Sequence, residues 1–133
     1  MGEEHRRKVL VVDDEPDAVE FVTAVMEEDG YEVVSASNVT EGFEKAVSER
    51  PDLIVLDVQM PGRDGFHMFA QLRSDATLKD VPVIMLTGIG DRTGMKFSAE
   101  SMGDYFGQEP EAYVEKPVEP EILQRTARKI LGG

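Results

Sequence analysis

The stretch VLVVDDEP at residues 9–16 decides the fold of this chain of 133 residues. Its first four residues are apolar and mostly β-branched, a continuous run that is typical of a parallel strand buried on both faces of a sheet. Two aspartates end the run, and Pro16 suits the first turn of a helix. The stretch therefore predicts a buried strand, a turn that carries carboxylates, and a helix that follows at once.

This order of strand and helix recurs along the chain. Strands are predicted at residues 9–12, 31–36, 53–56, 83–86 and 112–115, with helical patterns between them and a last helix at residues 121–131. Between residues 88 and 111 the pattern permits a helix without defining its ends. Repeated βαβ units with right-handed crossovers predict an α/β fold, a doubly wound five-stranded parallel sheet with helices on both faces.

Two of the predicted helices carry local signals that can be checked against the structure. Asn38 followed by Glu41 resembles a capping box at the start of the second helix. The apolar spacing of that helix predicts that Val47 belongs to its inward stripe. In the last helix, the same spacing predicts that Ile122 faces the core together with Leu123.

The chain is strongly acidic, with 27 Asp and Glu against 14 Lys and Arg and a formal net charge of −13. This charge repels phosphate backbones and anionic lipid headgroups, so direct binding to nucleic acid or to a membrane is not expected. The lack of cysteine excludes disulfides and thiolate chemistry, and no apolar run resembles a signal peptide or a spanning helix. We expect a cytoplasmic protein with a polar tail at residues 1–7, one domain at residues 8–131 and no output domain.

Functional side chains follow four of the predicted strands at their carboxyl ends. Asp13 and Asp14 follow the first strand, Asp57 the third, Thr87 the fourth and Lys116 the fifth. These ends share one edge of the sheet, where doubly wound folds bind ligands. Three carboxylates that converge there repel one another unless a cation lies among them, and such oxygen ligands suit Mg²⁺. The site therefore predicts Mg²⁺-dependent phosphoryl chemistry, with Asp57 as a carboxylate nucleophile.

With these residues at successive strand ends, the chain resembles the receiver domain of two-component response regulators over nearly its whole length. The resemblance implies a flavodoxin-like sheet with strand order 2-1-3-4-5. It implies that Asp57 accepts a phosphoryl group from a phosphohistidine of a sensor histidine kinase or histidine phosphotransfer protein. It also implies that Lys116 and Thr87 contact the phosphoryl group, and that the domain then controls a downstream protein.

The resemblance assigns further roles residue by residue. Mg²⁺ would be held by Asp14, Asp57 and the backbone carbonyl of Gln59, and Asp13 would support it directly or through water. Phosphorylation would move Thr87 and Tyr113, which lies three positions before the lysine, and the peptide bond between Lys116 and Pro117 is a candidate for the cis form.

Two other functions use similar residues. A phosphatase of the haloacid dehalogenase type also has an aspartate nucleophile and Mg²⁺, but it needs a second aspartate two positions later, where this chain has Gln59. A degenerate receiver that binds partners without phosphorylation would not need Asp57, Thr87 and Lys116 together. We therefore expect a chain that catalyses only its own phosphorylation and dephosphorylation.

The stretch from residue 88 to residue 121 departs from the usual pattern of the family. Thr87 and Lys116 are 29 positions apart, which is longer than expected, and residues 100–121 hold seven acids against one lysine. A solvated face explains this charge, and so does a docking surface for a basic protein partner. A homodimer is possible, and the sequence leaves open whether the receiver stands alone or was excised from a longer protein.

Overall fold

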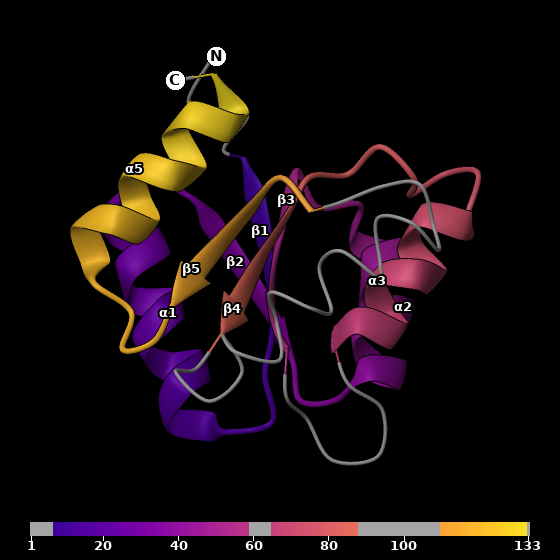
Figure 1. Cartoon of the computed structure of the whole chain (residues 1–133), viewed down its shortest axis with the longest axis horizontal. Helices are drawn as coiled ribbons and strands as arrows, with labels where there is room; N and C mark the ends of the chain where they lie inside the picture. Colours follow the sequence, from indigo (N-terminus) through magenta and orange to yellow (C-terminus); the bar gives the residue numbers. More distant parts are fainter. Residues whose placement is uncertain (1–6, 59–64, 88–109, 133) are drawn as a thin grey trace.

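We describe the protein from a computed structural model, which covers residues 7–58, 65–87 and 110–132 (Figure 1). The strands are β1 (Lys8–Val12), β2 (Glu32–Ala36), β3 (Leu53–Asp57), β4 (Val83–Thr87) and β5 (Ala112–Glu115). The helices are α1 (Pro16–Glu28), α2 (Val39–Glu49), α3 (Gly65–Ser74) and α5 (Pro120–Leu131). Each predicted strand is present, with boundaries that agree within one residue.

The five strands form one parallel sheet in the order β2-β1-β3-β4-β5, which confirms the predicted fold class. Helices α1 and α5 cover one face of the sheet, and α2 and α3 cover the other (Figure 1). The order places β1 and β3 side by side, with Val9 opposite Leu53 and Val12 opposite Leu56. The aspartates that end these two strands are therefore neighbours.

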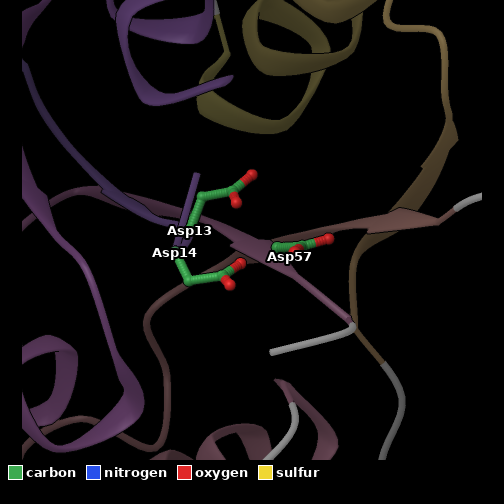
Figure 2. A group of neighbouring side chains, drawn as sticks. All are labelled: Asp13, Asp14 and Asp57. Atoms are coloured by element: carbon green, nitrogen blue, oxygen red, sulfur yellow. The ribbon is translucent and has the colours of Figure 1, made fainter. Parts of the chain in front are cut away.

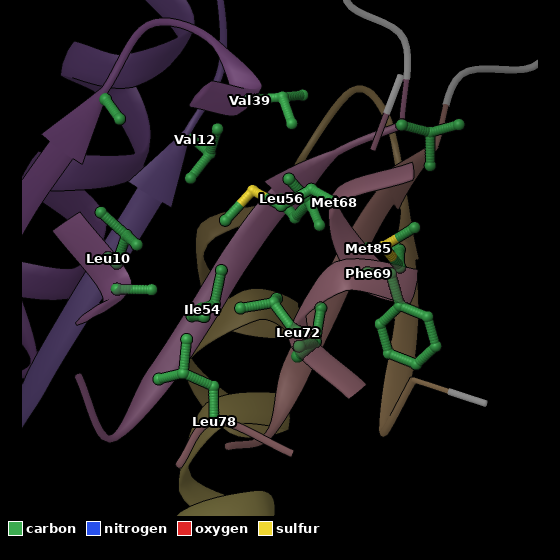
Figure 3. Packing of buried hydrophobic residues seen from close by; sticks show 14 residues of the cluster. Leu10, Val12, Val39, Ile54, Leu56, Met68, Phe69, Leu72, Leu78 and Met85 are labelled. Atoms are coloured by element: carbon green, nitrogen blue, oxygen red, sulfur yellow. The ribbon is translucent and has the colours of Figure 1, made fainter. Parts of the chain in front are cut away.

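Side chains of the central strands alternate between the two faces of the sheet. On one face, Leu10, Ile54 and Met85 pack with Phe69 and Leu72 of α3 (Figure 3). All five side chains are fully buried. Burial on this scale removes each apolar side chain from water at a gain of about 1.5–3 kcal/mol, which keeps the strands in place.

The opposite face of the sheet has its own hydrophobic cluster. Val11, Val55 and Ile84 pack there with Val22 of α1 and Leu123 of α5. Because both faces are covered, the central strands are continuous apolar runs, as the sequence predicts. The polar groups at the strand ends are therefore attached to buried, well-packed strands.

The N-terminus of α2 is capped, but differently from a complete capping box. The Asn38 side chain accepts a hydrogen bond from the backbone N–H of Glu41 at 2.8 Å, as predicted. The Glu41 carboxylate accepts from the N–H and the hydroxyl of Ser37, at 2.8 and 3.0 Å. In a complete capping box the Glu41 carboxylate would accept from the N–H of Asn38, but here it accepts from Ser37, the residue before the cap. This half of the prediction is wrong.

Two apolar residues that were predicted to face the core are exposed. Val47 is 50% exposed and Ile122 is 42% exposed. A residue that is adjacent in the sequence is rotated by 100° around a helix, and the buried stripes run through Ala46 in α2 and through Leu123 and Ala127 in α5. Among the helices that the structure describes, none is long and apolar enough to cross a bilayer.

Candidate functional site

Three carboxylates converge at the carboxyl ends of β1 and β3. Asp13 and Asp14 directly follow β1, and Asp57 is the last residue of β3. One carboxylate oxygen from each residue lies within 4.8 Å of the others (Figure 2). Asp13 and Asp57 are buried, whereas Asp14 is exposed. The cluster therefore has a buried floor and one side that is open to solvent.

The surroundings of the Asp13 carboxylate disfavour its charged form. It is only 1% exposed, and one oxygen accepts the backbone N–H of Glu15 at 3.0 Å. Its other oxygen is buried and has no hydrogen-bond partner among the described residues. Burial raises the pKa of Asp13 to about 6, and the negative charges of Asp57 and Asp14 act in the same direction.

Lys116 reaches the same cluster from the end of β5. Its Nζ donates to Oδ1 of Asp57 at 2.8 Å, and its backbone N–H donates to the carbonyl of Thr87 at 2.6 Å. Partial burial disfavours the charged lysine, but the hydrogen bond and the charge of Asp57 outweigh this effect and raise its pKa. The peptide bond between Lys116 and Pro117 is cis.

The other predicted site residues are Thr87, Tyr113 and Gln59. Thr87 is the last residue of β4, is 4% exposed and stands at the same edge as Asp57. Tyr113 lies within β5, opposite Met85, and packs half-buried against the core on the α2 and α3 side. Gln59, whose carbonyl was assigned to the metal, lies outside the described residues.

Gly65 is a site residue that sequence reasoning missed. Its N–H donates to the carbonyl of Val58 at 2.8 Å, which closes the connection that follows Asp57. A Cβ at this position would lie 2.3 Å from the backbone carbonyl oxygen of Asp57. Residues 61–65 read PGRDG, a composition typical of turns, so the sequence offers no separate signal that Gly65 approaches Asp57.

We expect Gly65→Ala to lower the free energy of unfolding by about 3 kcal/mol, because its Cβ meets backbone atoms that cannot move alone. Gly42→Ala is the matched control, since its Cβ would meet side-chain methyls of Val12 and Met68 at 3.0–3.1 Å. These contacts need the side chains to move by only a few tenths of an ångström, and alanine favours the helix, so the cost should stay below about 1 kcal/mol. Urea unfolding followed by circular dichroism measures both, and equal costs would contradict the prediction.

The residues of the cluster fit a divalent cation. The Asp13 oxygen that is buried without a hydrogen-bond partner among the described residues needs a positive charge or a proton, and the three ligands are oxygens, which Mg²⁺ prefers. Asp13 and Asp14 also line an open hollow beside the N-terminus of α1, so solvent can reach the cluster. The arrangement can therefore hold a cation beside the Asp57 carboxylate while Lys116 contacts that carboxylate from β5.

Comparison with known sequences gives matches along almost the whole chain. Residues 9–128 match the family model described as "Response regulator receiver domain". The chain is 33% identical over 126 residues to Protein PilH of Pseudomonas aeruginosa, which covers 95% of this chain and 98% of that protein. It is 38% identical to the probable transcriptional regulator ycf27 of Pyropia yezoensis, covering 97% of this chain but only 49% of ycf27. The chain thus spans nearly all of one relative and about half of the other.

Solved structures agree with the sequence matches. The chemotaxis protein CheY4 of Vibrio cholerae superposes with a TM-score of 0.81 at 31% identity, over 96% of this chain and 100% of that one. A putative response regulator from Chloroflexus aurantiacus gives a TM-score of 0.82 at 31% identity, over 97% of this chain and 100% of that one. This chain therefore shares its fold with both structures over nearly its whole length.

Proposed function

This chain belongs to the response regulator receiver domain family, and on that premise we propose that it accepts a phosphoryl group on Asp57. The donor is a phosphohistidine of a sensor histidine kinase or of a histidine phosphotransfer protein. The observation that carries the proposal is the buried Asp57 carboxylate, which Lys116 holds at 2.8 Å inside a cluster of three acids. An aspartate that only capped a turn would have no reason to be buried beside a lysine and two other acids.

The chemical step follows from the groups at the site. A carboxylate oxygen of Asp57 attacks the phosphorus atom, an acyl phosphate bond forms, and the bond from phosphorus to the imidazole nitrogen breaks. The electron pair of that bond leaves with the imidazole. Lys116 stays protonated, because the cluster raises its pKa, and its ammonium group balances negative charge first on Asp57 and then on the phosphoryl oxygens.

The acidic cluster would hold Mg²⁺ through Asp13, Asp14 and Asp57, with the Gln59 carbonyl as a further ligand by family resemblance. When bound, Mg²⁺ supplies positive charge that offsets repulsion between the carboxylates and the incoming phosphoryl group. Among the three acids, Asp13 would be stabilised most by this positive charge, since one of its oxygens is buried without a hydrogen-bond partner among the described residues.

Phosphorylation then changes which protein the domain binds. Thr87 is placed at the right edge to donate its hydroxyl to a phosphoryl oxygen, and a response of Tyr113 would carry the change along β5. We propose a downstream protein as the target, with no direct contact to nucleic acid or membrane. The chain has no separate substrate in this proposal, because the phosphoryl group stays on its own Asp57 until it is hydrolysed.

The acidic stretch 100–121 supports a docking role only in part. Residues 100–109 lie outside the described residues, and the Glu111 carboxylate contacts Arg73 and the N–H of Val83. Glu111 therefore serves the fold, and reversing its charge would not report on docking alone. Glu119 and Glu121 are exposed at the start of α5 and remain available to a basic partner.

The proposed function is tested by incubation with acetyl phosphate, with and without Mg²⁺, followed by intact mass spectrometry. We expect the mass to increase by one phosphoryl group only with Mg²⁺, and hydroxylamine to remove it, as it does from an acyl phosphate. A phosphatase would instead release free phosphate continuously, and a phosphorylation-independent binding module would gain no mass. Either result, or a modification that resists hydroxylamine, would overturn the proposal.

A further inference from the structure

An ion pair links α3 to the start of β5, at the opposite end of the sheet from the acidic cluster. Arg73, near the end of α3, donates to the Glu111 carboxylate at 3.0 Å. The same carboxylate oxygen accepts the backbone N–H of Val83, the first residue of β4, at 2.7 Å. The Glu111 N–H donates in turn to the Val83 carbonyl at 3.0 Å. Glu111 therefore ties β5 to β4 through both its backbone and its side chain.

The Arg73 guanidinium is buried and makes contacts with three other residues. Its side chain is 5% exposed, it also donates to the carbonyl of Val81 at 2.7 Å, and it lies 4.5 Å above the centre of the Phe69 ring. The buried Arg73 charge is costly without a partner, although the Glu111 side chain is 38% exposed, so loss of Glu111 would leave the guanidinium with fewer compensating contacts. The pair is therefore sensitive to any movement of Glu111.

β5, which begins directly after Glu111, pairs with only one strand in the described sheet. β5 is the last strand of the order and pairs with β4, from Ala112 opposite Ile84 to Glu115 opposite Thr87. Lys116 follows directly and donates its N–H to the Thr87 carbonyl at 2.6 Å. The position of Lys116 along the sheet thus depends on the register of an edge strand only four residues long.

We propose that Arg73 and Glu111 are positioning residues, which hold Lys116 against Asp57 by fixing the register of β5 on β4. This inference rests on the proposed role of Lys116 in phosphoryl transfer. The hydrogen bond from Lys116 to Asp57 spans 2.8 Å, and a hydrogen bond weakens steeply when its geometry changes. A shear of β5 by one residue repeat of about 3.3 Å would move the Lys116 backbone by more than the length of this hydrogen bond.

Graded variants at residue 111 separate this role from general stability. Glu111→Gln keeps an acceptor oxygen for the Val83 N–H but weakens the contact with Arg73, whereas Glu111→Ala loses both. We expect Glu111→Ala to slow phosphorylation by acetyl phosphate about tenfold, which is less than the roughly 10²-fold that a misplacement of about 1 Å can cost. Glu111→Gln should have a smaller effect in the same direction.

Hydrogen exchange provides a readout that does not depend on phosphorylation. In Glu111→Ala, the backbone amide of Lys116 should exchange faster, because its bond to the Thr87 carbonyl loosens. The amide of Val58 donates to the Leu86 carbonyl between β3 and β4, at the same end of the sheet, and should keep its protection. Equal changes at both amides would show only a general loss of stability and would overturn the inference.

Two control variants complete the test. Lys8 and Glu49 form an ion pair of 2.8 Å that touches β1, a strand flanked by β2 and β3, so Glu49→Ala should leave the phosphorylation rate unchanged. In a Lys116→Met background, Glu111→Ala should cause no further loss of rate, because the group that it positions is gone. An additional loss there, or a normal rate for Glu111→Ala in the otherwise native chain, would overturn the inference. Absence of phosphorylation in the native chain would instead contradict the proposed function.

Discussion

Asp57→Asn is expected to abolish the uptake of a phosphoryl group from acetyl phosphate in the presence of Mg²⁺. Asparagine has nearly the same shape as aspartate and can still accept a hydrogen bond from Lys116, so the fold should be retained. Its amide group is not a nucleophile under these conditions, and it removes one negative charge from the cluster. Intact mass spectrometry should therefore show the unmodified mass after any incubation time that saturates the native chain.

Asp17→Asn is the matched control for this experiment. Asp17 is an exposed aspartate in the first turn of α1, close to the same edge of the sheet but outside the three-carboxylate cluster. It should be phosphorylated like the native chain. A mass increase that persists in Asp57→Asn would place the acceptor elsewhere and contradict the assignment of Asp57.

The second large effect concerns Asp13 and the stability of the metal-free protein. The pKa of Asp13 is raised by burial from 3.8 to about 6, so the folded state binds a proton more tightly than the unfolded chain does. The stability that this proton supplies is complete below about pH 4 and is lost as pH rises through about 6. At pH 7.5 the ionised Asp13 thus destabilises the metal-free protein, by up to about 3 kcal/mol.

Asp13→Asn should remove this penalty. The asparagine oxygen can still accept the N–H of Glu15, while its amide replaces the buried oxygen that has no partner among the described residues. We expect the free energy of unfolding at pH 7.5 in EDTA to rise by about 1–3 kcal/mol and the gain to shrink towards zero near pH 4. Urea unfolding at both pH values measures it, with Asp17→Asn to correct for the loss of one charge from an acidic protein.

Adding Mg²⁺ should reverse the difference in free energy of unfolding between Asp13→Asn and the native chain. A cation that binds the folded state stabilises it in proportion to the logarithm of its concentration above the dissociation constant. The native chain should therefore gain stability when EDTA is replaced by Mg²⁺, whereas Asp13→Asn should gain much less. A variant that is less stable than the native chain in EDTA at pH 7.5, or that responds to Mg²⁺ as the native chain does, would contradict this account of Asp13.

Much of the site could be predicted because strand ends are visible in the sequence. The apolar runs that end at Asp13, Asp57 and Thr87 are long enough to mark both the strands and their final residues. Side-chain identity then indicated the chemistry, since carboxylates and a lysine at one edge of a parallel sheet suit a cation and a phosphoryl group. The strand order came from resemblance, because periodicity shows which faces are buried but not which strands are neighbours.

Other features depend on contacts between residues far apart in the chain. Glu111 belonged to an acidic stretch in the sequence, where a solvated carboxylate and one that is paired with Arg73 look the same. Glycine is common in turns for other reasons, so the sequence does not show that the missing side chain of Gly65 lets the backbone approach Asp57. Val47 and Ile122 met the spacing rule for a buried stripe, yet α2 and α5 are rotated so that both side chains are exposed.

The sequence by itself determined the fold class and the strand ends, and it indicated a kind of chemistry for them, because apolar periodicity and functional-group identity are local properties. Only the tertiary structure decided how those groups act together. It brought one oxygen from each of three acids within 4.8 Å, raised the pKa of Asp13 by burial, and joined Lys116 to Asp57 across 59 residues of chain. These are properties of distance and desolvation, which exist only once the strands lie side by side.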